Sequence, residues 1–316
     1  MGELMRRDIT YVNGVELEKA VEIIKNNFFT KEETGVIERQ VRSYYDFNIA
    51  YGEMIKYRNY EQCLAQMHES TGREVFHYNG HCAVCNSEQP FVVDFRFSEE
   101  VNGKRMLNWR ERLVCPNCGC SSRQRFIISK IFENYTDKTK VLVYEQASNL
   151  FAKIRRTLPE VTGFEYIGDS CKSKTNILGI DCENICGLSY PDEEFSLLVS
   201  NDVFEYTYDY EKAFREAWRV LKPNGKMIFT VPFNGNSDVT VRRVEIRENG
   251  LVHTDTPWYH GCPITGQEPL LVYEIFGWDI LETLKQCGFK YAYAKVYYGI
   301  EDGYMGYLPL YFEAVK

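Results

Sequence analysis

The pattern of apolar and polar positions divides the 316-residue chain into a helical beginning and a later part where strands and helices alternate. Residues 16–27 repeat apolar side chains at a helical period, and residues 36–67 predict one or two more amphipathic helices after a break at Gly35. Beyond residue 123, expected strands cover residues 140–144, 164–167, 195–200, 226–231, 291–298 and 309–315. Expected helices cover residues 125–135, 149–158, 210–221 and 278–287. Strands separated by helices predict an α/β fold with a parallel sheet covered on both faces.

This pattern predicts three parts along the chain. Residues 1–76 form a helical N-terminal extension, residues 77–122 a cysteine-containing module, and residues 123–316 a doubly wound α/β domain. The last two expected strands have no helix between them, so we expect them to pair as an antiparallel hairpin. An insertion at about 233–276 contains a second predicted hairpin with its turn at Glu248-Asn249-Gly250.

Two Cys-X-X-Cys pairs mark the module at residues 77–122. They are Cys82/Cys85 and Cys115/Cys118, and the residues between them, 86–114, predict a hairpin with strands at 91–97 and 106–114 and a turn at Asn102-Gly103. Two such tight turns supply the tetrahedral set of four thiolates that Zn²⁺ favours. Cys120 and His81 are nearby alternatives that break this spacing. With four protein ligands the site is closed, which predicts a structural zinc ion in a zinc ribbon.

Composition limits the setting of the chain and its partners. The net charge of −8 argues against a broad nucleic-acid surface, so nucleic acid is not expected as a partner. The N-terminus lacks the pattern of a signal peptide, and no apolar run approaches the length of a membrane span. We therefore expect a cytoplasmic protein without a membrane partner. In that reducing setting paired cysteines indicate metal ligands before disulfides.

Polar residues after the first two strands of the α/β domain predict a cofactor site. Ligands of open parallel sheets bind at the carboxyl ends of the strands. The first strand is followed by Glu145, Gln146 and Ala147, in a loop that leads into a helix whose N-terminal amides favour electron-rich groups. Asp169 follows the second expected strand, where a carboxylate can accept both hydroxyls of a ribose.

The stretch from 188 to 233 resembles the class I S-adenosylmethionine-dependent methyltransferases. The resemblance rests on three segments: residues 188–195, 200–206 and 213–225, the last ending in a turn similar to the family's "RVLKPGG". It extends over roughly residues 123–316 and implies a Rossmann-like, mostly parallel seven-stranded sheet, S-adenosylmethionine as cofactor and methyl transfer as activity. A zinc ribbon before this fold also resembles a bacterial subgroup of the family.

The chain departs from the family pattern in the implied cofactor site. The loop GxGxG is here Glu145-x-Ala147-x-Asn149, which lacks the freedom of glycine at positive φ. The aspartate expected to face the adenine amino group aligns with Asn184, whose amide oxygen can accept the same hydrogen bond. Ile185, which follows it, and Asn201 and Asp202, which end the fourth strand, complete the implied cofactor-binding set.

The insertion supplies candidate residues for the methyl acceptor. Methyl transfer requires alignment of donor and acceptor, and a base only when the acceptor must lose a proton. Trp258, Tyr259 and His260 form an aromatic and histidine cluster suited to substrate binding. His260 is the first candidate base, with a hydrogen-bonded structural histidine as the alternative. His253 and Tyr206 follow, and Tyr206 stands where the family has histidine and also belongs to the candidate substrate-binding set.

The expected acceptor is a small molecule or a sugar-containing metabolite, methylated on oxygen or nitrogen. Two other functions stay open. An RNA-base methyltransferase would use the arginines near the cysteines, which are Arg105, Arg110, Arg112, Arg123 and Arg125. A non-catalytic partner subunit would have lost the cofactor loop. The N-terminal helices are candidates for a homo-oligomer interface.

Overall fold

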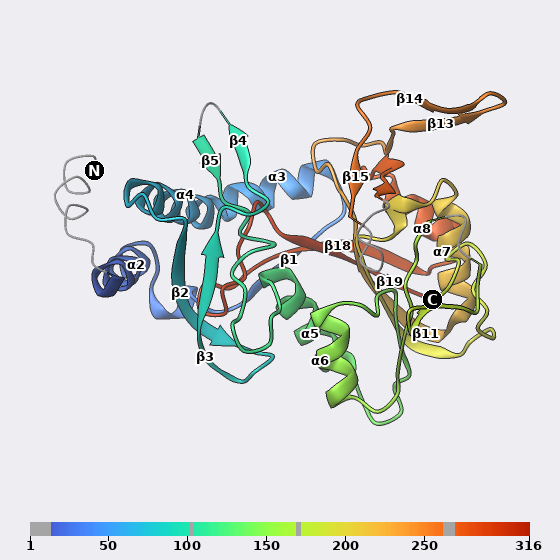
Figure 1. Ribbon diagram of the computed structural model, residues 1–316, viewed down its shortest axis with the longest axis horizontal. Coiled ribbons are helices and arrows are strands. Elements are labelled where there is room, and N and C mark those ends of the chain that lie inside the picture. The colour runs from blue at the N-terminus through green and yellow to red at the C-terminus, as the bar shows by residue number, and fades with distance from the viewer. Residues whose placement is uncertain (1–13, 102–103, 169–171, 262–268) are drawn as a thin grey trace. The chain divides into compact units, whose positions relative to one another are not determined.

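The structure is a computed structural model that describes residues 14–101, 104–168, 172–261 and 269–316 (Figure 1). Contacts divide the chain into two compact units. Unit 1 comprises Met1–Arg39, Ile49–Glu133 and Val296–Pro309, and unit 2 comprises Gln40–Asn48, Asn134–Lys295 and Leu310–Lys316. The helical extension and the cysteine module thus share one unit with a segment near the C-terminus. The division predicted at residues 76 and 122 stays a prediction.

A seven-stranded sheet has the strand order β1-β18-β19-β11-β10-β6-β7. Its strands are β1 (Ile37–Val41), β6 (Val141–Val143), β7 (Val161–Gly163), β10 (Phe195–Asn201), β11 (Leu221–Thr230), β18 (Tyr291–Tyr298) and β19 (Leu310–Val315). From β7 through β6 and β10 to β11 the pairing is parallel, and β11 pairs with β19 antiparallel. All three residues of β6 are buried, as expected of a central parallel strand. The predicted α/β fold with a mostly parallel sheet is confirmed.

Side chains cap the first turns of two helices of unit 2, α6 (Asn149–Thr157) and α7 (Tyr210–Val220). Helix α8 (Ile280–Gln286), also in unit 2, has no side-chain cap. The Ser148 hydroxyl accepts a hydrogen bond from Phe151 N at 3.0 Å, and the Asp209 carboxylate accepts one from Lys212 N at 3.1 Å. Each cap satisfies an amide that the first turn leaves without an intrahelical partner. Helix α7 then buries one face, which comprises Ala213, Phe214, Ala217 and Val220.

Two expected elements differ from the structure. Residues 37–41, expected within a helical segment, form the edge strand β1 because the sheet offers them a pairing partner in β18. The second strand of the α/β domain was expected at residues 164–167, but it ends at Gly163, where it pairs with Val143. The apolar run at residues 164–167 therefore follows the strand. Pairing with distant strands fixed the positions of both elements, and the local pattern of apolar residues does not reveal that pairing.

Unit 1 contains helices and short hairpins. Its elements include α2 (Gly14–Phe28), η1 (Lys31–Glu33), α4 (Ile55–Ser70), β2 (Val75–Cys82), β3 (Ser87–Asp94), β4 (Glu99–Val101) and β5 (Lys104–Met106), while α3 (Tyr44–Glu53) and α5 (Ser122–Asn134) each have residues in both units. The main hairpin is β2–β3, which corrects the expected pairing of residues 91–97 with 106–114. Of that pairing, the described residues keep one bridge, between Val92 and Val114. The predicted turn Asn102-Gly103 lies outside the described residues.

The predicted hairpin in the insertion is confirmed. Strands β13 (Val244–Arg247) and β14 (Gly250–His253) pair antiparallel, and Figure 1 shows them projecting from the rest of unit 2. Gly250 has a φ of +111°, which an L-residue rarely adopts. The other short strands are β8 (Thr175–Ile177), β9 (Ile180–Cys182), β12 (Val241–Arg242), β15 (Tyr259–His260), β16 (Leu270–Leu271) and β17 (Glu274–Ile275).

None of the described helices combines the length and the apolar character that crossing a membrane requires.

Candidate functional site

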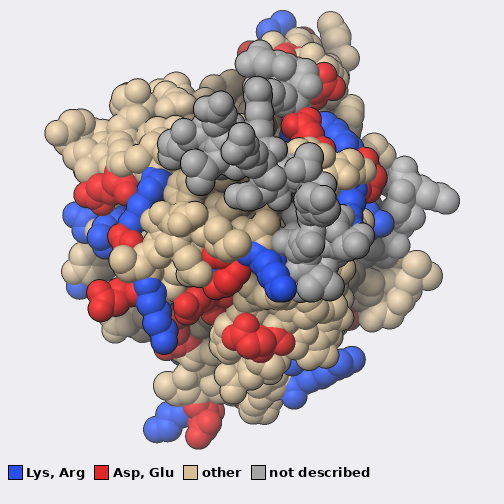
Figure 2. Space-filling model, turned by 90° about the vertical axis from the view of Figure 1, so that its left-hand side faces the viewer, with Lys and Arg blue, Asp and Glu red and all other residues tan. Residues whose placement is uncertain are grey.

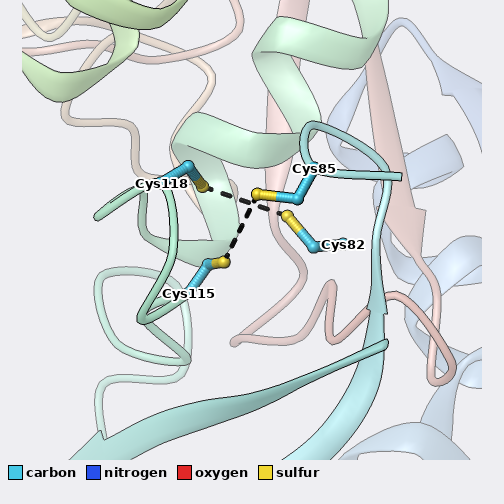
Figure 3. A group of neighbouring side chains, drawn as sticks. All are labelled: Cys82, Cys85, Cys115 and Cys118. Atoms are coloured by element: carbon cyan, nitrogen blue, oxygen red, sulfur yellow. Dashed lines mark hydrogen bonds between the residues drawn. The ribbon is translucent and has the colours of Figure 1, made fainter. Parts of the chain in front are cut away.

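Four cysteines of unit 1 converge on one point, as Figure 3 shows. The sulfur atoms of Cys82, Cys85, Cys115 and Cys118 all lie within 4.8 Å of one another. The Cys82 and Cys118 sulfurs are 3.9 Å apart, and those of Cys85 and Cys115 are 3.8 Å apart. A tetrahedral site with Zn–S bonds of about 2.3 Å places its sulfurs about 3.8 Å apart. The donor set and its spacing therefore fit Zn²⁺.

The two turns that carry these cysteines have the backbone bonds of zinc knuckles. Cys85 N donates to Cys82 O at 3.1 Å, and Gly119 N donates to Cys115 O at 2.9 Å with Gly119 at a φ of +72°. The two alternative ligands, Cys120 and His81, make other contacts. The Cys120 thiol faces the carbonyl oxygen of Cys118 at 3.7 Å, and His81 pairs with a carboxylate. Neither belongs to the cluster formed among the described residues.

A buried arginine links the cysteine module to residues 301–303 of the same unit. The Arg125 side chain is fully buried and donates to the carbonyl oxygens of Leu113, Asp302 and Gly303, and its guanidinium lies 3.7 Å from the centre of the Phe91 ring. On the other side of the module, His81 N donates to Glu301 O at 2.7 Å. These contacts begin next to both knuckles, so the fold of the module and the position of residues 301–303 depend on each other. Under the alternative of an RNA-base methyltransferase, Arg125 would contact phosphate, but its burial leaves no surface for phosphate.

In unit 2, the carboxyl ends of β6, β10 and β11 bring several predicted cofactor residues together. Asn201 ends β10, and its amide nitrogen donates to the Glu145 carboxylate in the loop after β6. Asn201 pairs in register with Thr230, which ends β11. The Asn201 amide oxygen and the Thr230 hydroxyl are buried without a hydrogen-bond partner among the described residues. Buried polar atoms of this kind indicate a site that a polar ligand completes.

The cofactor loop does not need the glycines of the family pattern. Among the described non-glycine residues with positive φ, none falls within residues 145–149. The loop is held by Glu165, whose carboxylate accepts hydrogen bonds from Gln146 N at 2.7 Å and Ala147 N at 2.6 Å. Burial raises the pKa of Glu165, while these two amides oppose the rise.

Sequence reasoning missed Glu165, because the strand was placed three residues too late. With the strand at 161–163, Glu165 is the first acidic residue after it. Asp169, which was expected in this role, lies outside the described residues. A search for the first carboxylate after the segment Val161-Thr162-Gly163 would have found Glu165.

The segment expected to face the adenine forms a compact turn. The Asn184 amide oxygen accepts a hydrogen bond from Cys186 N at 2.8 Å, and Asn184 N donates to the Ser173 hydroxyl at 3.0 Å. The Ile185 side chain is fully buried. Asp181, three residues earlier, donates its N–H to the Gln146 side-chain oxygen at 2.7 Å. Asp181 therefore lies beside the cofactor loop.

The structure brings His260 and Tyr206 together. The Tyr206 hydroxyl lies 2.6 Å from His260 Nδ1, and the Trp258 ring meets the His260 ring edge to face with centroids 4.9 Å apart. Tyr206 belongs to the short helix η2 (Phe204–Tyr206), which follows β10, and His260 belongs to β15. Burial lowers the pKa of His260, and the charge of Asp202 opposes this. His260 is therefore a hydrogen-bonded imidazole whose protonation is disfavoured by burial.

The remaining candidate residues in the insertion are more exposed to solvent. His253 is exposed at the end of β14, on the projecting hairpin, and pairs with Val244. Tyr259 is also exposed, and it pairs with Leu271. Asp202 has a φ of +53°, a strained value for a residue with a side chain, and its N–H donates to Thr230 O at 2.9 Å.

Residues 146–229 match a family model described as a methyltransferase domain. These residues span the cofactor loop, β10, η2 and α7. No match was found among curated protein sequences.

Three solved structures illustrate the similarity, all at low sequence identity. The YcgJ protein from Bacillus subtilis is 17% identical with a TM-score of 0.26, and the alignment covers 35% of this chain and 50% of that one. An S-adenosylmethionine-dependent methyltransferase from Mesorhizobium loti is 12% identical with a TM-score of 0.38, over 61% of this chain and 97% of that one. One from Methanosarcina mazei is 13% identical with a TM-score of 0.35, over 59% and 95%.

The alignment spans half the length of the Bacillus protein. TM-scores this low do not support a structural conclusion. The match at residues 146–229 stands without them, and the described fold of those residues agrees with it. The chain therefore contains a segment, residues 146–229, that matches a methyltransferase domain.

Proposed function

We propose that the protein transfers a methyl group from S-adenosylmethionine to a hydroxyl or amine of a small-molecule or sugar-containing acceptor, and that a structural zinc ion supports its fold. The observation that carries this proposal is the Tyr206–His260 pair, with its hydroxyl and ring nitrogen 2.6 Å apart. It lies in the same unit as the methyltransferase domain, and Tyr206 itself belongs to that domain.

The residues at the strand ends fit S-adenosylmethionine. The cofactor supplies a methyl group on a positively charged sulfonium, together with ribose hydroxyls and an amino acid group. Carboxylates on Glu145, Glu165 and Asp202 provide negative charge at this edge of the sheet. The amide oxygen of Asn201 and the hydroxyl of Thr230 are buried acceptors that the described residues leave without a partner. We expect these groups to orient the cofactor.

His260 is proposed as the base that takes a proton from the acceptor. In the tautomer with hydrogen on Nδ1, the ring donates to the Tyr206 oxygen and presents the lone pair of Nε2. Tyr206 fixes the ring, and Trp258 packs against it. A neutral imidazole held by one hydrogen bond is suited to general-base catalysis. The acceptor class then carries a proton that leaves on methylation, as hydroxyls and amines do.

The zinc proposal rests on the four converging thiol groups of Cys82, Cys85, Cys115 and Cys118. Their free thiols and their spacing suit a reducing, cytoplasmic setting. In such a site the zinc ion contributes folding free energy and takes no part in methyl transfer.

An RNA acceptor finds less support. Lys and Arg side chains are interspersed with Asp and Glu on the face drawn in Figure 2. Several of the arginines near the cysteines are also neutralised by neighbours, for example Arg105 by Glu74 and Arg112 by Asp94. Phosphate binding needs a field of unpaired cations, which this mixture of charges does not supply.

Calorimetry with S-adenosylmethionine and its product S-adenosylhomocysteine tests the proposal. We expect both to bind the zinc-loaded protein with one site per chain. A labelled methyl group should then pass to a member of a panel of phenols, amines and nucleotide sugars. Absence of binding would favour the partner-subunit function, and transfer to RNA alone would favour the RNA-base function.

Replacing Glu165 with alanine is expected to weaken cofactor binding. The change leaves Gln146 N and Ala147 N without their acceptor, and a buried amide without a partner costs about 1–3 kcal/mol. We expect the Kd for S-adenosylhomocysteine to rise roughly 10- to 100-fold. Glu160→Ala, which removes an exposed carboxylate before the same strand, should leave the Kd unchanged. Equal Kd values for the Glu165→Ala variant and the unmodified protein would contradict this role.

A further inference from the structure

The hairpin formed by β13 and β14 projects from the rest of unit 2 and carries an exposed apolar pair (Figure 1). Ile246 and Leu251 lie directly opposite each other across the two strands, and their side chains are 53% and 49% exposed. Among the described residues, no third strand pairs with this two-stranded sheet. A hairpin of only two strands is marginally stable in water, and further strands stabilise it. The hairpin therefore presents an open edge beside an exposed apolar pair.

The open edge of β13 has its hydrogen-bonding groups at Ile246. Where the hairpin joins the rest of unit 2, Thr254 N donates to Arg243 O at 2.8 Å. In an antiparallel ladder, every second residue turns its N–H and C=O toward the neighbouring strand. Counted from Arg243, residues 245 and 247 face β14, and Ile246 turns its N–H and C=O to the open edge. These two groups can therefore pair with an added strand.

The charges on either side of Ile246 complement a second copy of the same strand. Glu245 and Arg247 lie on the other face of the hairpin, and their exposed side chains form an ion pair at 2.6 Å. When two copies of β13 lie antiparallel with Ile246 at the centre, Glu245 of each copy lies opposite Arg247 of the other. Opposite charges in such cross-strand positions stabilise a sheet. Strand β14 has no acidic or basic pair of this kind, because its sequence is Gly-Leu-Val-His.

We propose that the edge of β13 is an interaction surface for a second copy of this chain. The two β13 strands pair antiparallel around a twofold axis, and Ile246 N of each copy donates to Ile246 O of the other. The product is a four-stranded sheet in which Ile246 and Leu251 of both copies form one apolar cluster. The same edge serves both copies, as in other twofold interfaces. This surface is independent of the methyl-transfer proposal, because it contains neither the Tyr206–His260 pair nor the cofactor loop.

The expected dimer is weak. Each copy contributes a strand of four residues, and interfaces that bury less than about 1,200 Å² are typically transient. Exposed ion pairs add little affinity, but they exclude registers that place like charges opposite each other. We therefore expect a dissociation constant of about 1–100 µM, with the register set by the charges.

Sedimentation equilibrium of the full-length protein, purified with zinc, tests this surface between about 1 and 500 µM. We expect a monomer–dimer equilibrium. Arg247→Glu and Glu245→Arg should each raise the dissociation constant at least about tenfold, because each variant places like charges opposite at both flanking positions. An equimolar mixture of the two variants should form a heterodimer, since every acidic side chain then meets a basic one. Lys285→Glu makes the same change of charge in an exposed ion pair of α8 and should leave the dissociation constant unchanged.

Ile246→Pro tests the backbone contact. Proline removes the outward N–H at the centre of the interface, and its ring occupies the open edge. The N–H of Ile246 points away from β14, so no hydrogen bond inside the hairpin is lost. We expect the dissociation constant to rise at least about tenfold. His253→Pro makes the same change at the outer edge of β14, which the proposed dimer does not use, and should leave the dissociation constant unchanged.

Three results would overturn the proposal. The first is a monomer at every concentration in this range, and the second is a dimer that Ile246→Pro leaves intact. The third is a failure of Arg247→Glu and Glu245→Arg to associate with each other when mixed. The circular dichroism and Tm of each variant establish folding. The two charge variants change exposed side chains of the hairpin, so they remain informative even if Ile246→Pro does not fold.

Discussion

Cys115→Ser is expected to prevent binding of the proposed zinc ion and to unfold the cysteine module. Cys115 is fully buried, and its sulfur lies within 4.8 Å of the other three, so no water can replace it without opening the site. Structural zinc sites bind with apparent free energies of about 10–16 kcal/mol, which the folded state gains. We expect a loss of one zinc ion per chain by metal analysis and a fall in Tm of roughly 10 °C or more.

Cys120→Ser provides the matched control. Cys120 is also buried and lies two residues from Cys118, but its thiol faces a carbonyl oxygen rather than the cluster. This variant should retain its zinc and most of its stability. Full zinc content in Cys115→Ser, or equal zinc loss in both variants, would show that these four cysteines do not form the site.

Loss of the proposed zinc ion should also destabilise the position of residues 301–303. Arg125 joins Leu113 to the carbonyl oxygens of Asp302 and Gly303, and His81 N donates to Glu301 O beside the first knuckle. When the module unfolds, these carbonyls lose their donors. We therefore expect hydrogen exchange in the segment 299–306 to accelerate on chelation, together with exchange in β2 and β3. Protection that persists at 299–306 would show that this segment holds its position without the module.

His260→Asn is expected to lower kcat by about 10²- to 10⁴-fold, the range that a general base contributes. Asparagine keeps a polar group near Tyr206 but cannot take a proton at neutral pH. The reaction is measured with whichever acceptor receives the labelled methyl group. Binding of S-adenosylhomocysteine should be unchanged, since His260 belongs to the insertion and not to the cofactor loop.

Two variants and a pH profile separate catalysis from structure. His253→Asn makes the same substitution on the exposed hairpin and should leave kcat unchanged. Tyr206→Phe removes the hydroxyl 2.6 Å from His260 Nδ1 and should lower kcat less than loss of the imidazole does. An unchanged kcat in His260→Asn would exclude His260 as the base and assign it a structural role.

The pH dependence follows from the burial of His260. Only the neutral imidazole can act as a base, and it is the form present above its pKa. Burial lowers this pKa below 6.5, so the acid limb of kcat/KM should have its midpoint below pH 6.5. The charge of Asp202 opposes this shift, so Asp202→Asn should move the limb to still lower pH. A limb at or above pH 6.5 in the unmodified protein would contradict the assignment.

Local patterns located most of the α/β domain. The continuous apolar run at 195–200 and the alternating face of residues 210–221 specify a buried strand and an amphipathic helix by themselves, and the structure has β10 and α7 there. Hairpin β13–β14 was equally visible, because Asn249-Gly250 supplies the turn. These elements depend on contacts within a few residues.

Other elements depended on distant partners. Residues 37–41 became a strand because β18 lies beside them in the sheet, and Glu165 reached the cofactor loop because β7 begins three residues earlier than the apolar pattern suggests.

The sequence by itself determined which residues can carry chemistry here: the cysteine spacing, the methyltransferase segment and the aromatic cluster at 258–260. Spacing within a tight turn is enough to aim two thiolates at one metal ion. Only the tertiary structure decided that His260, and not His253, meets Tyr206, although 54 residues separate the pair. The physical reason is that a hydrogen bond over that separation exists only after the insertion has folded back against the end of β10.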